Sequence, residues 1–587
     1  MSNGSGEILR AKEKLFPAQS TQRSETLRQR WFEGKNLAFT VILALIMFLV
    51  FYPILLLFIN SFKVGAYGQE TFWGLDNWIQ AFQENGLRSA LINTITMSLI
   101  RQIIALVLGI ILAWILARTD LPGRNWLEFG FWIAFFLPSL PMTLSWILLF
   151  DPDKGAINQL FAAMPFLQFL NFNIFSYWGI IWVHLATTTV AVKVMLLTPA
   201  FRNMDNSLEE ASRTCGASTI HTFTRVLIPV MAPIILVVTI MGLIHALESF
   251  EIELILGAPE HINVYSTLIY HLIYQQPPNY GSATVLGTVI LLLMLPFILF
   301  QQWVTRQGGH ATVTGKYNGQ LFRLGKWRWP LCAVITCIVL MITVFPLIVL
   351  IAGTLMKYFG RFTIPSPWTW KHWMEVLDHP VFLNALKNTL VLAFGTAILS
   401  ILFLSVIAYI IVRTKYSGKS WLDFFSWLPI SLPGVVIGLG MLWLFLGTKI
   451  FNPIYGTIFI LILATFLAQM TRGVQVFKSN FVQLGNELEE ASKVNGASWL
   501  YTFRRVILPI ISPSVAVVGI MAFATAARTT SHVALLSTSD TQPLSILQLN
   551  YMADGSYEAA SVIGVITLVL TLGVALIARL FGLKLRG

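Results

Sequence analysis

Two passages of the chain repeat each other: "LEEASRTCGASTIHTFTRVLIPVMAP" at 208–233 and "LEEASKVNGASWLYTFRRVILPIISP" at 488–513. They align without a gap at an offset of 280 residues, and 14 of the 26 aligned residues are identical. The identical residues include acids, small residues, a glycine and two prolines. A polar passage kept so closely within one apolar chain indicates that both copies contact the same kind of partner.

The remainder of the chain is strongly apolar. Of its 587 residues, 56% are hydrophobic and 11% are charged, whereas a soluble domain averages about 25% charged residues. A membrane-spanning helix needs about 20 mostly apolar residues. Twelve runs meet this length, and the predicted spans lie at 37–61, 91–117, 126–149, 176–198, 227–247, 282–304, 329–356, 386–411, 421–447, 456–474, 506–527 and 560–582. The first run is too long for a signal peptide, so we expect it to be retained as a span.

The internal repeat extends well beyond the opening passages. "AWILARTDLPGRNWLEFGFW" at 113–132 matches "AYIIVRTKYSGKSWLDFFSW" at 408–427, and "ALINT" at 90–94 matches "ALKNT" at 385–389. These pairs are offset by 295 residues instead of 280, so we expect the first copy to carry extra residues in its loop at 151–173. The chain is therefore predicted to be an all-α polytopic membrane protein of about 12 transmembrane helices, in two parallel six-helix pseudo-repeats.

Four segments follow from this pattern. They are an N-terminal tail at 1–36, a first six-helix half at 37–304, a Gly-rich basic linker at 305–328 and a second six-helix half at 329–587. The tail is expected to be mobile or to form one short surface helix.

The positive charges predict the orientation in the membrane. With the N-terminus inside, 29 of the 39 Lys and Arg residues fall on or near the cytoplasmic side, as the positive-inside rule requires. Both termini are then cytoplasmic. The net charge of +12 is explained by this bias, so we expect no nucleic-acid partner.

Each repeated passage lies between the fourth and fifth spans of its half, on the predicted cytoplasmic side. We expect a short helix with acids in its first turn, a glycine turn at Gly216 or Gly496, and a second helix that leads through Pro229 or Pro509 into the fifth span. A helix that only lies on lipid needs an apolar face and does not require the same small and charged residues twice. The repeat therefore favours a protein socket on the cytoplasmic side.

The passages resemble the coupling motif of bacterial ABC-importer permeases. That motif reads Glu-Ala-Ala, three residues, Gly, nine residues, Ile-x-Leu-Pro. The chain has Glu210-Ala211-Ser212, Gly216 and Val226-x-Ile228-Pro229, and again Glu490-Ala491-Ser492, Gly496 and Val506-x-Leu508-Pro509. It departs from the motif by Ser for the second Ala, Val for Ile and, in the first copy, Ile for Leu. At this length the chain looks like the fused permeases of the binding-protein-dependent type I family, in the subfamily for ferric iron, thiamine and aminoethylphosphonate.

The resemblance implies the partners. Two copies of a cytoplasmic ABC ATPase subunit would dock on the coupling helices, and a periplasmic substrate-binding protein would deliver the cargo to a permease in the bacterial inner membrane. ATP and Mg would be bound by the ATPase, with no cofactor or metal held by this chain, which is then not an enzyme. "GKS" at 418–420 lacks the glycine that a P-loop places five residues before its second glycine. The implied ATPase-coupling residues are Glu209, Glu210, Ala211, Ser212, Gly216, Ala217, Glu489, Glu490, Ala491, Ser492, Gly496 and Ala497.

A secondary transporter of the major facilitator type is the alternative from another class, since it also has two six-span halves. Its loop motif is only partly matched by "LARTDLPGRN" at 116–125, which lacks the leading glycine. The second copy lacks the aspartate as well.

Acidic residues follow the fifth span of the first half. Glu248, Glu251 and Glu253 lie there without a Lys or Arg between them, whereas Arg528 replaces Glu248 in the second half. Ionisable residues in the membrane are functional candidates, so the predicted translocation path or gate comprises Glu248, Glu251, Glu253, Arg528 and His532. The alternative is that Glu248 and Arg528 pair across the two halves. Arg101, within the second span, is expected to face the bundle interior.

The carboxylates also bear on the cargo. Hard cations such as Fe(III) prefer oxygen ligands, so a carboxylate-rich mouth favours ferric iron. Thiamine or an organophosphonate remains the alternative cargo.

Overall fold

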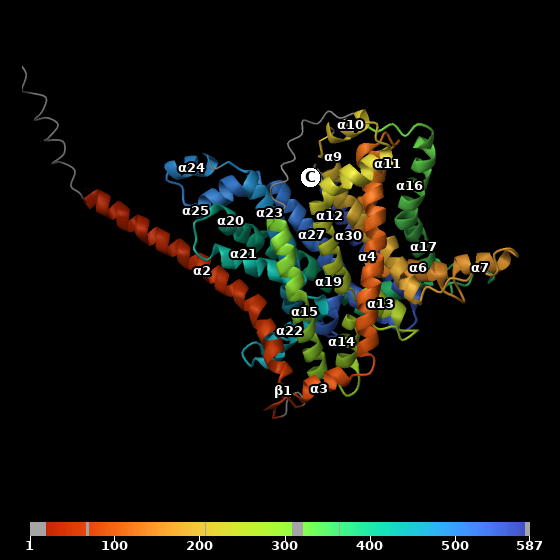
Figure 1. Ribbon diagram of the computed structural model, residues 1–587. Helices are drawn as coiled ribbons and strands as arrows, with labels where there is room; N and C mark the ends of the chain where they lie inside the picture. The colour runs from red at the N-terminus through yellow and green to blue at the C-terminus, as the bar shows by residue number, and fades with distance from the viewer. Residues whose placement is uncertain are drawn as a thin grey trace, which may run out of the picture.

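The computed structural model describes residues 19–65, 70–205, 207–307, 321–362, 364–485 and 487–580 (Figure 1). Nine of the described helices are long and apolar enough to cross a membrane, and the number is 12 if each of three bent pairs is one span. The all-α polytopic fold is therefore confirmed. Residues 1–18 of the predicted tail, 308–320 of the predicted linker and the last seven residues of the chain lie outside the described residues.

The helices of the first half are, in order, α2 (Gln19–Ser61), α3 (Asp76–Gln83), α4 (Leu87–Arg118), α5 (Arg124–Phe136), α6 (Ser139–Phe150), α7 (Ala156–Ala163), α8 (Tyr177–His184), η1 (Leu185–Thr189), α9 (Val190–Arg202), α10 (Ser207–Thr214), α11 (Thr219–Thr222), η2 (Phe223–Leu227), α12 (Ile228–Leu247), α13 (Glu251–Gly257), α14 (Tyr265–Tyr274) and α15 (Tyr280–Gln307). Two short antiparallel strands, β1 (Lys63–Val64) and β2 (Phe72–Trp73), follow α2, with Lys63 opposite Trp73. Because α2 begins at Gln19, the helix of the first span extends into the stretch predicted as a tail.

The helices of the second half are η4 (Gly325–Trp327), α16 (Arg328–Ile342), α17 (Val344–Leu355), α18 (Lys371–Asp378), α19 (Pro380–Leu399), η5 (Ser400–Leu404), α20 (Ser405–Arg413), α21 (Lys419–Trp427), η6 (Leu428–Ser431), α22 (Gly434–Gly447), η7 (Asn452–Ile454), α23 (Ile458–Gln483), α24 (Glu487–Val494), α25 (Trp499–Thr502), η8 (Phe503–Ile507), α26 (Leu508–Ile510), α27 (Ser512–Arg528), α28 (Ser531–Leu536), α29 (Leu544–Ala553) and α30 (Tyr557–Leu580). The segments η1, η2, η5 and η8 are single π-helical turns inside longer helices.

The third span of each half is sharply bent. The helices α5 and α6 meet at 102°, and α21 with η6 meets α22 at 114°. A proline disfavours the helical conformation of the residue before it, and Leu137, before Pro138, is extended with ψ 130. Leu432, before Pro433, is extended in the same way. The spans predicted at 126–149 and 421–447 are each made of two helices for this reason.

The first helices of the two halves are exchanged. The helix α2 of the first half packs against α21 and α22 of the second half, and the rings of Phe51 on α2 and Phe425 on α21 have their centroids 6.4 Å apart. In return, α16 and α17 of the second half pack against α5 and α6 of the first. The halves are therefore interlocked rather than merely joined by the linker.

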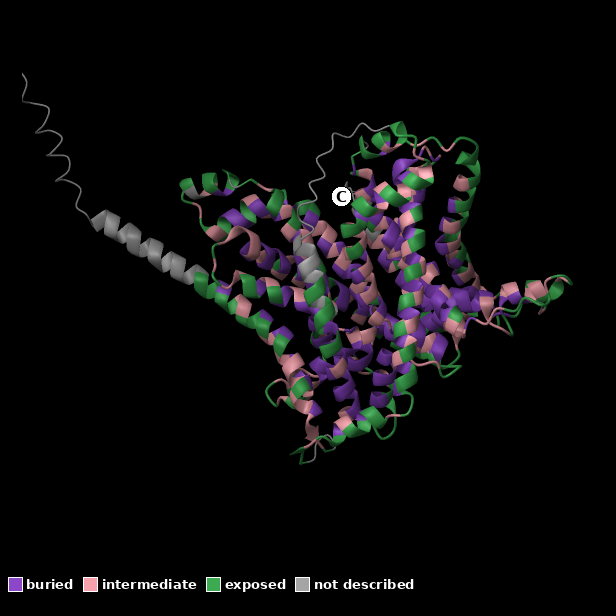
Figure 2. Ribbon diagram, in the orientation of Figure 1, coloured by how far each residue is buried: buried purple, intermediate pink, exposed green. Residues whose placement is uncertain are grey.

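The outer surface is apolar where lipid is expected. Figure 2 shows buried residues in the centre of the bundle and exposed residues along its outer helices. On α4, Ile92, Ile95, Leu99, Ile103 and Val107 are all exposed, at the three- and four-residue spacing of one helix face. Contact of such a stripe with lipid costs no free energy, whereas its exposure to water is unfavourable.

The close packing of α5 against α16 predicts that a larger residue at Gly130 destabilises the protein. A Cβ atom on this residue of α5 would lie 2.2 Å from Cγ1 of Val339 on α16. Gly130→Val should therefore lower the melting temperature of the purified protein, at a cost of about 1–3 kcal/mol for overpacking. Adding Val339→Gly should restore most of the loss. Gly573→Val is the matched control, because a Cβ there meets nothing within 4 Å; equal effects of both variants would contradict the close contact between the halves.

Candidate functional site

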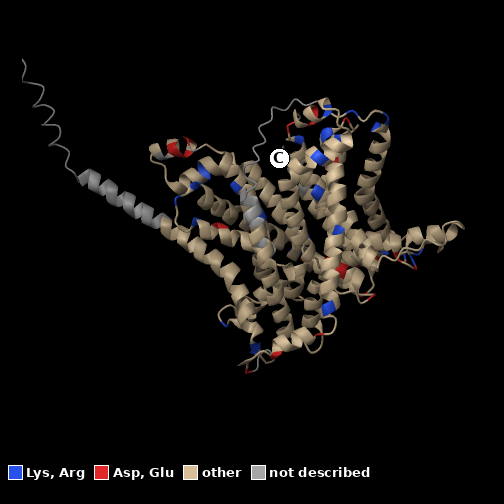
Figure 3. Cartoon of the chain, in the orientation of Figure 1, with Lys and Arg blue, Asp and Glu red and all other residues tan. Residues whose placement is uncertain are grey.

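The two repeated passages form matching helical elbows. The first elbow comprises residues 207–222, with α10 and α11, and the second comprises 487–502, with α24 and α25. Asn206 and Asn486, just before them, lie outside the described residues. Both elbows lie at the same end of the molecule (Figure 1), and Figure 3 shows acidic residues on α10 and α24 there.

Glycine makes the turn in each elbow. Gly216 has φ +81 and Gly496 has φ +74, in the left-handed region, and nothing lies within 4 Å of a Cβ built on either residue. The backbone conformation, and not crowding, therefore requires glycine. The N–H of Gly216 donates to the carbonyl of Arg213 at 2.9 Å, and the N–H of Ala217 donates to that of Ser212 at 3.1 Å, which is the Schellman pattern for ending a helix.

A hydroxyl pair closes each elbow. The Oγ atom of Ser212 lies 2.9 Å from Oγ1 of Thr222, and Ser492 lies 2.8 Å from Thr502 in the same way. These serines are the residues that depart from the second alanine of the coupling motif. The departure therefore has a structural partner, since each pair joins the first helix of its elbow to the second.

The first glutamate of each elbow points inward. Glu209 is buried and pairs with Nε of Arg118 at 3.0 Å, while Arg118 also donates to the carbonyl of Met204 at 3.2 Å. Glu489 is buried and pairs with Nε of Arg413 at 3.2 Å. The structure thus places these two predicted coupling residues against the protein, where they anchor each elbow to the end of the second span of its own half.

The ion pair of Glu489 with Arg413 has two contacts that the pair of Glu209 with Arg118 lacks, one to Tyr409 and one to Gly485. Glu489 also accepts a hydrogen bond from the hydroxyl of Tyr409 at 3.0 Å. Arg413 further donates to the carbonyls of Leu484 at 3.0 Å and Gly485 at 2.9 Å. Sequence reasoning missed Arg118 and Arg413 as partners, although both stand in an Arg-Thr pair that the repeat keeps.

The outward face of each elbow is acidic and small. Glu210, Ala211 and Gly216 are exposed, as are Glu490, Ala491 and Gly496. Ser212, Ala217 and their counterparts Ser492 and Ala497 are partly buried. Each elbow therefore presents an exposed glutamate and small residues to a partner, while the adjacent buried glutamate holds the elbow in place. The second elbow exposes Glu487 as well.

The alternative that Glu248 and Arg528 pair across the halves is not what the structure shows, since each has other neighbours. Arg528 donates to the carbonyls of Phe135 at 2.9 Å and Leu137 at 3.3 Å. These carbonyls lie at the end of α5, where Pro138 stops the helix and leaves acceptors without intrahelical donors. Glu248 instead lies beside His245, with Oε2 3.7 Å from Nδ1. Arg528 does join the two halves, but through the broken helix.

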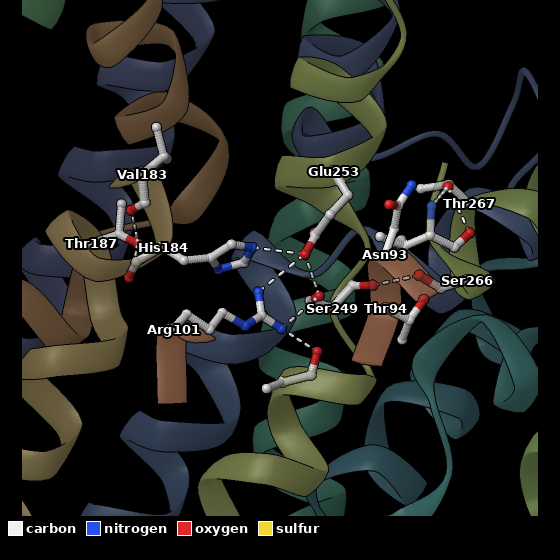
Figure 4. A network of polar contacts seen from close by, with 12 residues as sticks. Asn93, Thr94, Arg101, Val183, His184, Thr187, Ser249, Glu253, Ser266 and Thr267 are labelled. Atoms are coloured by element: carbon white, nitrogen blue, oxygen red, sulfur yellow. Dashed lines mark hydrogen bonds and ion pairs between the residues drawn. The ribbon is translucent and has the colours of Figure 1, made fainter. Parts of the chain in front are cut away.

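A buried polar network surrounds Glu253 in the first half (Figure 4). Its Oε1 atom accepts from Arg101 at 3.1 Å and lies 2.8 Å from Nε2 of His184. Ser249 also donates to this carboxylate and accepts from Arg101. Arg101 and Glu253 are 2% and 1% exposed, so the expectation that Arg101 faces the bundle interior is confirmed.

The predicted pathway residues do not form one cluster. Glu251 accepts a hydrogen bond from Ser139, and His532 lies 3.0 Å from Oγ1 of Thr465. Across the described residues, no three His, Cys, Asp or Glu side chains come together as a metal site would require. Each carboxylate thus has a neighbour within the protein, so the acids do not form the open oxygen-rich mouth that the sequence suggested for a cation.

Comparison with known proteins identifies a family. The sequence profile described as "Binding-protein-dependent transport system inner membrane component" matches the chain twice, at residues 105–307 and 401–587. Both matches include one elbow.

Individual relatives share about a quarter to a third of their aligned residues with the chain. A ferric transport system permease protein FbpB of Actinobacillus pleuropneumoniae is 28% identical over 66% of the chain, which spans only 56% of that protein's length. A probable ABC transporter permease protein, y4fN, of Sinorhizobium fredii is 25% identical and covers 84% of the chain and 87% of its own length. A probable sulfate transport system permease protein of Nephroselmis olivacea is 30% identical over 37% of the chain and 74% of its own length.

The ion pair of Glu209 with Arg118 predicts different roles for Glu209 and Glu210. Glu209→Gln should leave Arg118 buried without its counter-charge, a change that costs about 3–5 kcal/mol in buried pairs. Hydrogen exchange of the α10 amides should then quicken at least tenfold. Glu210→Gln is the matched control and should leave exchange unchanged, because Glu210 is exposed. Similar exchange in both variants would show that Glu209 does not anchor the elbow.

Proposed function

The chain belongs to the family of binding-protein-dependent transport system inner membrane components, and from this premise we propose that it is the permease of an ATP-driven importer. One chain supplies both halves of the permease. The observation that carries the proposal is the pair of elbows, which repeat one geometry in both halves and expose the same residues.

The elbows are the docking points for two copies of a cytoplasmic ABC ATPase. Glu210 and Glu490 supply a charge for the partner, and Ala211 and Ala491 permit close approach. The buried pairs of Glu209 with Arg118 and Glu489 with Arg413 then carry a displacement of each elbow to α4 or α20. Such coupling works because packed interfaces switch between discrete arrangements instead of deforming smoothly. ATP and Mg are bound and used by the ATPase, so this chain is a transport subunit and not an enzyme.

The elbows face the cytoplasm in this proposal. The distribution of Lys and Arg supports this orientation, because the positive-inside rule then predicts both termini on that side. The membrane in this proposal is a bacterial inner membrane. A periplasmic binding protein delivers the cargo to the opposite end of the molecule, around β1, β2, α3 and α14.

Ferric iron is the proposed cargo. Its support is the ferric transport permease among the relatives. The carboxylates add no support, because they do not come together as a metal site in the described residues. The sulfate permease among the relatives makes sulfate a second candidate to be measured beside iron, thiamine and an organophosphonate.

Reconstitution tests the function. The chain is placed in liposomes with its ATPase and binding protein, and uptake of radiolabelled cargo is followed. We expect uptake only when ATP, the ATPase and the binding protein are all present. The double variant Ala211→Leu with Ala491→Leu should reduce uptake at least tenfold and release the ATPase on size-exclusion chromatography, because larger side chains prevent close approach.

Ser417→Leu is the matched control, since Ser417 is exposed in the loop between α20 and α21, outside both elbows. It should leave uptake unchanged. Uptake without the ATPase, or normal uptake by the double elbow variant, would contradict the proposal and favour a secondary transporter.

A further inference from the structure

The first half carries a long loop that the second half lacks. The loop between α6 and α8 covers residues 151–176, whereas the corresponding loop between α22 and α23 covers only 448–457. Residues 155–172 of the long loop, here called the wing, include α7 and project sideways from the bundle beyond α17 (Figure 1). The elbows and their buried ion pairs do not involve the wing.

The wing exposes large apolar side chains. Phe166 and Phe169 are 72% and 80% exposed, and Leu160 and Leu170 are exposed as well. The wing contains no Asp, Glu, Lys, Arg or His, and Figure 3 shows α7 without charged residues. An apolar patch of this kind marks contact with a protein partner or with a membrane.

The polar side chains of the wing are largely bonded within the loop. Asn158 is buried, and its Nδ2 donates to the carbonyls of Asp151 at 3.0 Å and Phe172 at 2.9 Å. Its Oδ1 accepts from the N–H of Phe172 at 3.1 Å, and Gln168 donates to the carbonyl of Ala162 at 3.2 Å. Polar groups that are paired in this way do not need water, so the wing can enter an apolar environment.

The base of the wing lies at the end of three membrane spans. Gln159 donates to the carbonyl of Gly360 at 2.7 Å, and Gly360 stands five residues after the span Gly325–Leu355. The wing itself follows the bent third span, which ends at Phe150, and precedes the span Tyr177–Arg202. This last span runs from the wing to the first elbow, so the wing lies at the membrane surface opposite the elbows.

The surroundings of the wing favour lipid over a protein partner. Ile348 and Ile351 are exposed on α17, and this helix ends at the base of the wing, so the wing continues an apolar surface that lipid covers. Charged residues stand only at the base, where Asp153 and Lys154 are exposed. An element that lies in the membrane interface keeps its charges at the headgroups and places its apolar face among the acyl chains.

We propose that the wing lies in the lipid of the leaflet opposite the elbows, with Phe166 and Phe169 inserted among the acyl chains. The helix α6, which leads into the wing, has 12 residues, whereas a helix that spans a bilayer alone needs about 20. The wing therefore anchors the outer end of a half-span in the membrane. Because it carries no charge, its insertion does not depend on the charge of the lipid headgroups.

Site-specific photo-crosslinking tests the proposal on the full chain in nanodiscs of phosphatidylethanolamine and phosphatidylglycerol. Neither the ATPase nor the binding protein is present, so the result does not depend on the proposed transport function. The photoreactive residue p-benzoylphenylalanine replaces Phe169 in one variant and Phe166 in another, and each should form phospholipid adducts that mass spectrometry detects. Val494 is the control position, because it is 86% exposed in the second elbow, and the same replacement there should give no lipid adduct.

A second irradiation includes the periplasmic binding protein, and the lipid adducts of the wing should persist. Both wing variants keep an aromatic ring at an exposed position, and size-exclusion profiles show whether each is folded. The proposal is overturned if Phe166 and Phe169 give no more lipid adduct than Val494. It is also overturned if both wing positions crosslink to the binding protein in place of lipid, since the wing would then be a docking surface for that protein.

Discussion

The bilayer core contains no water to satisfy polar groups, and this constraint governs where the charges of the chain lie. An unpaired carbonyl or charge there costs several kcal/mol. The prolines that bend the third spans release carbonyls at the end of α5, and Arg528 of the other half satisfies two of them. Arg101, His184 and Glu253 satisfy one another in the same way. Polar contacts inside the membrane therefore coincide with the places where the helices are broken or the halves meet.

At the end of the molecule that carries the elbows, two neighbouring acids lie in different environments. Glu209 is withdrawn into an ion pair with Arg118, whereas Glu210 stays in solvent. The pairing fixes the elbow on a spanning helix, and the hydroxyl pair of Ser212 and Thr222 fixes its two arms to each other. A surface element that is held at both points can transmit a push into the membrane without being itself remodelled.

Sequence predicted the features that depend on local properties. The lengths of apolar runs gave the spans, the offsets of the repeat gave the two halves, and Gly216 and Gly496 marked turns because few other residues adopt positive φ. The sequence did not predict contacts between residues that lie far apart along the chain. The partners of Arg528 lie more than 390 residues away, and Arg101 and Glu253 are 152 residues apart. Nothing in a Glu-Glu pair says which acid turns inward, and the length of an apolar run does not show that its prolines bend it.

The exchange of first helices between the halves has a consequence for biosynthesis. The flank of α2 that packs on α21 and α22 has no protein partner until those helices are made, more than 350 residues later. At about 5–20 residues per second, this delay is on the order of 20–80 seconds. The nascent protein therefore spends most of its translation with lipid in the place that α21 and α22 later take. The exchange of first helices is therefore completed only when the last third of the chain is synthesised.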